Sequence, residues 1–537
     1  MFQQALIHVI VFLASLVAFG ASSEDVCLSG DRCRSDRVHP WPNVRGNVGS
    51  YGTSQLKAPR DLSKPSWRWH HPNGQFGTVV TGGPVIDDEL NLYIVEMKGV
   101  HKFSPDGRVL WSQAPEPQSD PGVVFPDGPS IMGNRVFVTT SRGELCAFDM
   151  ADGNLIWKKQ YHNSSGGDSK YVSTYDGVVI IGNGNARFAT DGGSQYIVAA
   201  DANTGEKLWE FAPDSPTWNN MAMFGGDDTF VIQDFDSRVY RLGLHNGTLL
   251  WKNGGMTKNK TKQIDVDTWT DGGTILGADG GVYAVSSKLN ILGAFHILRP
   301  FAGGGVHAYR YSDGKLLWEK DVPLPVLTWP VSAKVGDHSD YTLFAFPGAT
   351  SIGPTDNQII MFLVVYCTCT CLFWKLVSWV CGRRGILYPA VILCCVPLLL
   401  FTLRYRFFLG TPSEMYAFNA KTGELQWSYE LDFMKKKDAR GDFEGLYTRL
   451  YKHPQPWRPI CLPVAYSSPT VDGNGVVFIG HMSGKLFGVK DWNSDGRISK
   501  DEVSVFDAEA AFLHSGPAFA PGIFAVTTCD SLWVWRM

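Results

Sequence analysis

Short stretches of alternating apolar and polar residues recur along the chain, and tight glycine-containing turns join them in pairs. The clearest copy begins at Ala199, turns between Asn203 and Gly205, and ends at Trp209. Alternation predicts β-strands, because successive side chains of a strand point to opposite faces of its sheet. The glycine suits a tight hairpin turn, which needs a positive φ that other residues adopt only at a steric cost. Further copies of this strand–turn–strand phrase end at Trp111, Trp157, Trp251, Trp318 and Trp427.

The spacing of these tryptophans predicts how the units are arranged. Most successive copies lie roughly 40 to 50 residues apart, and a further pair of strands precedes most of them, which is typical of a propeller blade. The interval from Trp251 to Trp318 is longer, and it fits either one blade with a long loop or two short blades. We therefore predict an all-β fold, a single β-propeller of seven or eight blades. Its last strand should lie beside the start of the chain, so that the ring closes without exposed edges.

Three features carry a family resemblance. They are the opening Trp-Pro-Asn-Val-Arg-Gly-Asn at residues 41–47, the Ser-Trp-Arg-Trp at residues 66–69, and the repeated Asp-x-x-Thr-Gly-x-x-Leu-Trp phrase. With them the chain resembles the PQQ-like (pyrroloquinoline-quinone repeat) β-propeller family over roughly residues 41–537, apart from one insertion. The resemblance implies that the repeated tryptophans pack between neighbouring blades. It leaves function open, because the family includes quinoprotein dehydrogenases, outer-membrane assembly scaffolds and kinase sensor domains.

The interval from Trp318 to Trp427 is too long for one blade and contains an insertion at residues 358–409. Two apolar segments of about 20 residues flank a basic turn with Arg383 and Arg384, which predicts a transmembrane helical hairpin with a cytoplasmic tip. The membrane would then be a partner through residues 359–409. Removing the insertion restores an ordinary blade spacing, so a retained intron explains the same sequence. In either case the propeller comprises residues 41–357 and 410–537.

The amino terminus predicts export. Residues 1–21 contain an apolar run followed by small residues, as in a signal peptide. No Lys or Arg precedes that run, so an uncleaved anchor is the alternative. We expect a protein of the secretory pathway, either membrane-anchored with a lumenal or extracellular propeller, or secreted if the insertion is not translated. Three acceptor sequences for N-glycosylation agree with this route, at Asn163, Asn246 and Asn259.

Five of the eleven cysteines lie outside the insertion, and four of these suggest disulfides. Cys27 and Cys33 bound a short loop that a disulfide could close. Cys461 precedes the strands of the last full blade and Cys529 enters the closing strand, so we predict that they pair across the closure. Two independent buried thiols are the alternative.

Charge narrows the class of partner. The chain has 48 Lys and Arg residues against 52 Asp and Glu residues, for a net charge of −4. No basic block stands out, so we predict that the chain does not bind nucleic acid.

The densest cluster of oxygen-bearing side chains lies at residues 491–502 and resembles the calcium loop of EF-hand proteins. Acidic or amide residues occupy its first, third and fifth positions, Gly496 permits the sharp turn at the sixth, and a glutamate closes the twelfth. Ca²⁺ favours such a loop because six to eight hard oxygen ligands must replace its water. We predict that the ligands are Asp491, Asn493, Asp495, Glu502 and the backbone carbonyl of Arg497.

The residues around this loop depart from the EF-hand pattern. Residues 485–490 and 503–506 read as strands, and Gly488 argues against a helix. We therefore expect the calcium loop to clamp a hairpin of a blade and to stabilise it, without acting as a switch. The alternative is that the loop is an ordinary blade turn that happens to be acidic.

The sequence is compatible with two functions, that of an enzyme and that of a non-catalytic scaffold. Quinoprotein dehydrogenases carry a vicinal cysteine pair over the cofactor, whereas the vicinal pair here, Cys394 and Cys395, lies inside the insertion. No catalytic aspartate can be assigned by motif, and no hydrolase motif is present. We therefore expect a non-catalytic, calcium-binding scaffold for an unidentified protein or glycan, without bound PQQ. The alternative is a PQQ-dependent oxidoreductase similar to quinoprotein alcohol dehydrogenases.

Overall fold

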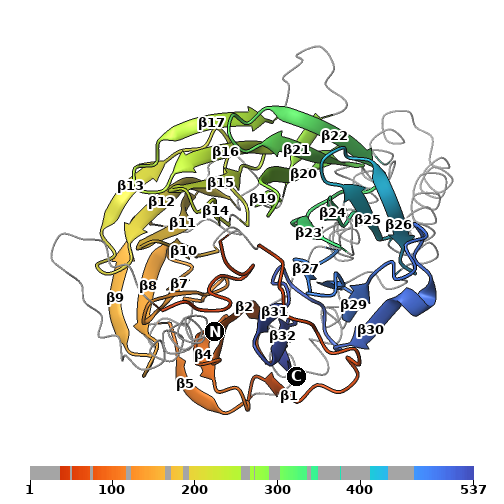
Figure 1. The fold of residues 1–537 in the computed structure, drawn as a ribbon. Helices are drawn as coiled ribbons and strands as arrows, with labels where there is room; N and C mark the ends of the chain where they lie inside the picture. Colours follow the sequence, from red (N-terminus) through yellow and green to blue (C-terminus); the bar gives the residue numbers. More distant parts are fainter. Residues whose placement is uncertain are drawn as a thin grey trace, which may run out of the picture.

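The described strands form eight sheets arranged as the blades of a ring (Figure 1). The fold is therefore an all-β, eight-bladed propeller, which decides between the seven and eight blades that the spacing allowed. The computed structural model describes residues 37–48, 51–72, 77–115, 123–163, 171–185, 193–219, 221–255, 266–270, 273–289, 303–335, 340–348, 375, 412–432, 434 and 465–537.

Each blade is an antiparallel sheet whose strands pair in chain order, with two exceptions: β1 joins the last blade, and β18 and β19 both pair with β20. The first four blades consist of β2 (Val80–Ile86), β3 (Leu92–Glu96), β4 (Gly99–Phe103) and β5 (Val109–Gln113); β6 (Ser130–Met132), β7 (Arg135–Thr139), β8 (Glu144–Asp149) and β9 (Leu155–Gln160); β10 (Ser173–Tyr175), β11 (Val178–Asn185), β12 (Ser194–Asp201) and β13 (Lys207–Phe211); and β14 (Met223–Phe224), β15 (Thr229–Gln233), β16 (Arg238–Gly243) and β17 (Leu249–Gly254).

The next three blades and the closing blade complete the ring. They consist of β18 (Val266–Trp269), β19 (Ile275–Leu276), β20 (Gly281–Leu289), β21 (Gly304–Arg310) and β22 (Leu316–Val322); β23 (Val331–Lys334), β24 (Tyr341–Ala345), β25 (Glu414–Asn419) and β26 (Leu425–Glu430); β27 (Thr470–Val471), β28 (Val477–Gly480), β29 (Lys485–Val489), a 3₁₀ turn η3 (Lys500–Glu502) and β30 (Val503–Asp507); and β31 (Ala518–Ala520), β32 (Ile523–Thr527), β33 (Ser531–Arg536) and β1 (Trp67–His70).

The closing blade joins the two ends of the chain. β1 pairs antiparallel with β33, so that Trp67 lies opposite Val534 and Trp69 opposite Leu532. The predicted closure is therefore confirmed. A strand from the start of the chain therefore forms the outer edge of the last blade and joins the two ends of the ring.

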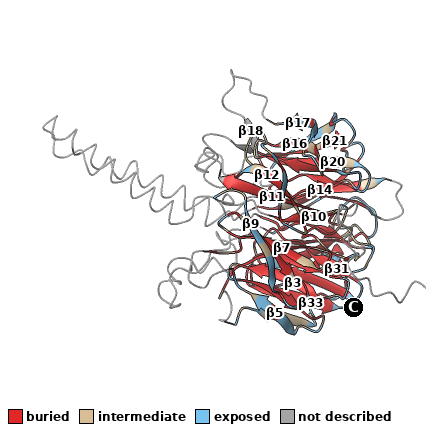
Figure 2. Ribbon diagram, turned by 90° about the vertical axis from the view of Figure 1, so that its left-hand side faces the viewer, coloured by how far each residue is buried: buried red, intermediate tan, exposed pale blue. Residues whose placement is uncertain are grey.

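Burial follows the position of a strand within its blade. Every residue of the second strand β3 is buried, whereas exposed and buried residues interleave along the outer strand β5. Figure 2 shows the same contrast between the buried inner strands and the exposed outer strands β5 and β9. Inner strands are packed on both faces by neighbouring blades, so they read as continuous apolar runs, and the outer strands keep the alternating pattern.

The repeated tryptophans pack between neighbouring blades, as the resemblance implied. The indole N–H of Trp209 donates a hydrogen bond to the carbonyl of Leu244 in the next blade, at 2.8 Å. A Cβ atom on Gly247 would lie 2.7 Å from the same indole ring, and Gly247 has a φ of +65°. Glycine is needed there for the turn and for the close approach. The contact recurs in the pairs Trp67–Gly107, Trp111–Gly153, Trp157–Gly205, Trp251–Gly314 and Trp318–Gly423.

The two ends of the ring differ. Turns between the first and second strands, and between the third and fourth, are mostly short and share one end of the ring, because neighbouring strands are antiparallel. We call this end the short-turn face; residues 176–177 and 244–248 are examples. The segment made of residues 41–48 and 51–58 runs through the centre of the ring (Figure 1). It bonds to the inner strands of five blades, at Ile86, Ile131, Thr174, Phe224 and Val471.

The prediction that a transmembrane hairpin interrupts the fold is wrong. In the described part of the chain, no helix is both long and apolar enough to span a membrane. β24 and β25 flank the insertion in sequence and pair directly, with Leu343 opposite Phe418, so this blade is complete without the intervening residues. The prediction rested only on the length of two apolar segments, and length alone does not show that a segment is a helix. Residues 358–409, except Lys375, lie outside the described residues, as do residues 1–21.

Candidate functional site

The predicted calcium loop connects β29 to β30 on the short-turn face. Its stem is a β-hairpin in which Val489 pairs with Val503. The expectation that strands, and not helices, flank the loop is therefore confirmed. Where other blades make this connection with a tight glycine turn, this blade uses residues 490–502.

Hydrogen bonds fix the first half of the loop around Asp491. The two carboxylate oxygens of Asp491 accept the backbone N–H groups of Asp495, at 3.2 Å, and Gly496, at 3.0 Å. The side chain of Asn493 accepts the Asp495 N–H at 3.0 Å, and Asp495 in turn accepts the N–H of Arg497 at 2.8 Å. Gly496 has a φ of +77°, as the sharp turn at this position requires.

Glu502 draws the second half of the loop back to the first. One of its carboxylate oxygens accepts the N–H of Trp492 at 2.7 Å, and the other accepts the N–H of Ser499 at 2.9 Å and the Ser499 hydroxyl at 2.8 Å. These bonds to Ser499 and Trp492 lower the pKa of Glu502 below its usual value, so the carboxylate stays charged and able to bind a cation.

The predicted calcium ligands lie in one loop, but their ligand atoms do not all point to one common position. Asp491, Asn493 and Asp495 are linked by hydrogen bonds through Asp495, and Glu502 accepts the Asn493 N–H at 3.4 Å. Among the described His, Cys, Asp and Glu residues, however, the carboxylates of this loop do not form a group whose ligand atoms all lie within 4.8 Å of one another. Closing the loop around an ion would therefore require movement of its exposed carboxylates.

A cavity of about 670 Å³ lies beside the loop and is lined by Trp427, Lys490, Asp491, Trp492 and Gly496, among others. Trp427 is the counterpart of the tryptophans that meet a turn glycine in the next blade. Here the nearest atom to a Cβ on Gly496 would be the Gln426 carbonyl oxygen, at 3.3 Å. The loop therefore stands away from Trp427. Trp492 is 55% exposed, with the Lys490 ammonium 4.2 Å from its ring centroid.

Arg45 is buried at the centre of the ring, where the sequence had suggested no site. Its guanidinium donates one hydrogen bond, to the Pro330 carbonyl at 3.0 Å, while its Nε and Nη1 have no partner among the described residues. Burial lowers the pKa of Arg45 to about 9. Arg45 belongs to the opening motif at residues 41–47, and no local pattern distinguishes it as a site residue.

Aromatic side chains occupy the same central region. Trp329 makes edge contacts with Tyr171, at 5.8 Å between ring centroids, and with His514, at 6.0 Å. These residues precede the first strands of three blades that are not neighbours, so the contacts bridge the centre of the ring. A Cβ on Gly52 would lie 2.5 Å from Arg45 Nη2, so the arginine is also closely packed.

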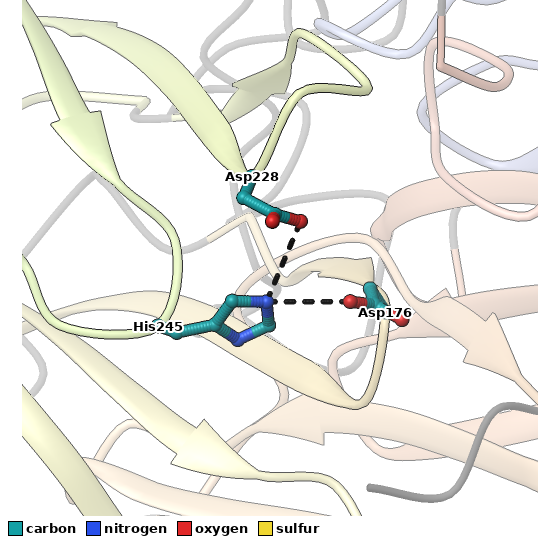
Figure 3. A group of neighbouring side chains, drawn as sticks. All are labelled: Asp176, Asp228 and His245. Atoms are coloured by element: carbon teal, nitrogen blue, oxygen red, sulfur yellow. Dashed lines mark ion pairs between the residues drawn. The ribbon is translucent and has the colours of Figure 1, made fainter.

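The structure also brings together three residues that the sequence analysis missed. Asp176, Asp228 and His245 have ligand atoms that all lie within 4.8 Å of one another on the short-turn face (Figure 3). They come from different turns of two blades and share no motif, so no local sequence signal could have found them.

The remaining predicted site residues stay predictions. Asn163 and Asn246 are exposed, which a glycosylated asparagine requires, and Asn259 lies outside the described residues. Cys529 is buried, whereas Cys27, Cys33 and Cys461 lie outside the described residues. Neither predicted disulfide is therefore tested.

Comparison with known proteins supports the repeat type. The family model for the outer membrane protein assembly factor BamB, a PQQ-repeat family, matches residues 96–297 and 235–335. The match supports PQQ-type repeats over residues 96–335 of the propeller. The chain is 33% identical over 116 residues to the quinohemoprotein alcohol dehydrogenase ADH-IIG of Pseudomonas putida, which is 20% of this chain and 16% of that protein. It is 27% identical over 191 residues to a quinohemoprotein alcohol dehydrogenase of Comamonas testosteroni, covering 34% and 26% of the two chains. The matches therefore span about a quarter or less of these relatives.

Solved structures agree on the fold. BamB from Moraxella catarrhalis superposes with a TM-score of 0.51 at 12% identity, covering 88% of this chain and 99% of that one. The quinohemoprotein alcohol dehydrogenase from Comamonas testosteroni gives a TM-score of 0.51 at 12% identity, covering 96% and 82%. At this identity the likeness concerns the fold alone. The neighbours include both an assembly factor and an enzyme, so they do not decide the function.

Proposed function

We propose that this chain is a calcium-binding PQQ-repeat propeller that acts as a non-catalytic binding scaffold in the secretory pathway. The observation that carries the proposal is the arrangement of residues 491–502. Asp491, Asn493 and Asp495 hold the turn through the hydrogen bonds that a calcium loop uses, and Glu502 closes it from the twelfth position.

The position of the loop supports a structural role for the ion. Calcium would hold together a long connection between β29 and β30, beside the cavity that separates the loop from Trp427. No helix pair flanks the loop, so there is nothing to reorient as in an EF-hand sensor. The ion would then stabilise the folded state by mass action.

Calcium titration calorimetry of the purified full-length chain tests this proposal. We expect one site whose affinity falls at least tenfold in Glu502→Gln, because the amide keeps the size but loses the charge of the bidentate ligand. Asp152→Asn is the matched control, since Asp152 is an exposed acidic residue in the corresponding turn of another blade. Equal calcium affinity in the wild-type and Glu502→Gln proteins would contradict the proposed site.

The packing at the centre of the ring bears on where a scaffold would bind its partner. Residues of the segment 51–58 contact an inner strand, with the Phe224 N–H donating to the Tyr51 hydroxyl, and Trp329 contacts Tyr171 and His514 across the ring, so the chain's own side chains occupy part of the described centre. The proposed partner is a protein or glycan bound on the outside of the ring. Loss of mass from the secreted protein on treatment with an N-glycosidase, at Asn163 or Asn246, would support the secretory route.

Quinone-dependent oxidation of an alcohol is the second candidate. Curated relatives named as quinohemoprotein alcohol dehydrogenases favour it, as does Arg45, because a buried guanidinium with unpaired N–H groups suits a carboxylate such as those of pyrroloquinoline quinone. The close packing of Gly52 against Arg45 and the position of Trp329 argue against it, because both take up space beside the guanidinium.

Spectroscopy separates the two candidates. The scaffold proposal predicts no quinone absorption in the purified chain and no dye-linked alcohol oxidation after incubation with pyrroloquinoline quinone and calcium. A bound chromophore that disappears in Arg45→Met would establish the second candidate instead.

A further inference from the structure

A cluster of side chains that could hold a metal ion lies between two neighbouring blades of the short-turn face. Asp176 occupies the turn between β10 and β11, Asp228 the turn between β14 and β15, and His245 the turn between β16 and β17. Figure 3 shows the two carboxylates directed at the same edge of the imidazole ring. The cluster is far in sequence from residues 491–502 and belongs to different blades.

The distances in this cluster suit a small divalent ion. His245 Nε2 lies 3.3 Å from Asp176 Oδ2 and 3.6 Å from Asp228 Oδ1. Zinc binds imidazole nitrogen and carboxylate oxygen at about 2.0–2.2 Å in tetrahedral geometry, which separates the ligand atoms by about 3.4 Å. The two distances from His245 Nε2 are therefore close to that spacing, and the two carboxylate oxygens lie within 4.8 Å of each other.

The imidazole of His245 provides an independent indication of a ligand. Both of its ring nitrogens are buried, and neither has a hydrogen-bond partner among the described residues. The neighbouring carboxylates approach Nε2 without satisfying it as a hydrogen-bond donor. Buried polar atoms are nearly always satisfied in native proteins, so an unpartnered nitrogen facing two carboxylates calls for a bound species. A metal ion on Nε2 would provide one.

The backbone also holds the two carboxylates in place. Asp176 and Asp228 both have positive φ, at 44° and 58°, a conformation uncommon for residues other than glycine and asparagine. A hydrogen bond from the Leu244 N–H to the Asp228 carbonyl, at 2.7 Å, ties the turn of Asp228 to the residue before His245. The ligands from this blade therefore share one hydrogen-bonded frame.

We propose that Asp176, Asp228 and His245 bind a divalent transition metal of the zinc class. One imidazole and two carboxylates are a usual donor set for zinc, whereas calcium is bound by six to eight oxygen atoms. Three protein ligands leave a fourth position for water. The ion joins the β10–β13 blade to the β14–β17 blade, so this site is separate in chemistry and in place from the calcium loop.

Metal titration of the full-length chain, stripped with a chelator and then dialysed, tests this proposal. We expect one equivalent of Zn²⁺ to bind in competition with a chelating dye, and Co²⁺ in the same site to give the visible absorption of a tetrahedral complex. Asp176→Asn and Asp228→Asn should each weaken binding at least tenfold. Asparagine tolerates the positive φ of these turns, and Asp228 is 74% exposed, so both variants should fold.

Two controls keep the result specific. His162→Gln removes a partly exposed histidine that is paired with Glu210 at 2.9 Å, and it should bind zinc like the wild type. Glu502→Gln should also leave zinc binding unchanged, so failure of the calcium proposal would not affect this result. An absence of stoichiometric zinc binding, or equal affinity in Asp228→Asn and His162→Gln, would overturn the proposal and leave an ion pair only.

Discussion

The indole N–H of Trp111 donates a hydrogen bond to the carbonyl of Met150, at 3.1 Å, although Trp111 ends one blade and Met150 belongs to the next. Gly153 lies against the same ring, with a φ of +76° and a hypothetical Cβ 2.7 Å from the indole. Each blade therefore recognises the next through one tryptophan and one glycine. This is the physical reason why the two residues recur together in the sequence.

This relationship predicts different costs for two glycine substitutions. Gly153→Ala must place a Cβ into the Trp111 ring in addition to straining a positive φ, whereas Gly280, at φ +77°, has no atom within 4 Å of its Cβ position. We expect Gly280→Ala to lower the free energy of unfolding by about 1 kcal/mol and Gly153→Ala by about 2 to 4 kcal/mol. Equal costs in urea unfolding would show that the turn conformation, and not the contact, selects glycine.

His481 predicts a pH dependence of stability. Burial lowers its pKa to about 3, with the nearby charge of Lys485 adding to the effect, and its Nε2 lies 3.0 Å from the Ser413 hydroxyl. Its pKa is lower in the folded than in the unfolded state, so the unfolded chain binds more protons below about pH 6.5 and stability falls as the pH decreases. Between pH 7 and pH 4.5, the free energy of unfolding should fall in both proteins. We expect the fall in His481→Gln to be smaller than that in the wild type by about 2 to 3 kcal/mol. Chemical unfolding in the presence of a chelator measures both losses.

His162→Gln is the control for this experiment, because His162 is partly exposed. Its stability should decline with acid as the wild type does. The same decline in His481→Gln would mean that other groups control the acid sensitivity.

The proposed pairing of Cys461 with Cys529 remains to be tested chemically. Peptide mapping without reduction should recover the two cysteines in one linked fragment. A disulfide that closes a loop of this length adds roughly 4 kcal/mol, so Cys461→Ser, Cys529→Ser and the double variant should all lose about the same stability. Losses that add in the double variant, or alkylation of both thiols without reduction, would indicate two independent cysteines.

The blade repeat was predictable because its signals are local. A turn glycine and the tryptophan that ends a hairpin, such as Gly205 and Trp209, stand four residues apart and report the hairpin by themselves. The number of blades depended on the interval between Trp251 and Trp318. The structure resolves it as one five-stranded sheet from β18 to β22.

The parts that the sequence could not supply depend on contacts between distant segments. Arg45 meets Pro330 only because residues 41–48 run through the centre of the ring, and His245 meets Asp176 only because two blades are adjacent. The transmembrane prediction failed for a related reason: apolar length in residues 358–409 is a local signal that contains no information about the fold around it. The calcium loop could be proposed because its ligands follow one another within twelve positions.

The central claim is that calcium bound at residues 491–502 stabilises the propeller without switching it. The most direct measurement is the melting temperature of the chain with excess calcium and with a chelator, recorded together with the fluorescence of a dye that binds exposed apolar surface. At a concentration 100-fold above Kd, calcium should add about 3 kcal/mol to the free energy of unfolding and so raise the melting temperature by several degrees. The dye fluorescence before unfolding should not change. Glu502→Gln should lose most of the increase, and Asp152→Asn should keep it. An unchanged melting temperature with calcium, or an increase that persists in Glu502→Gln, would contradict the account.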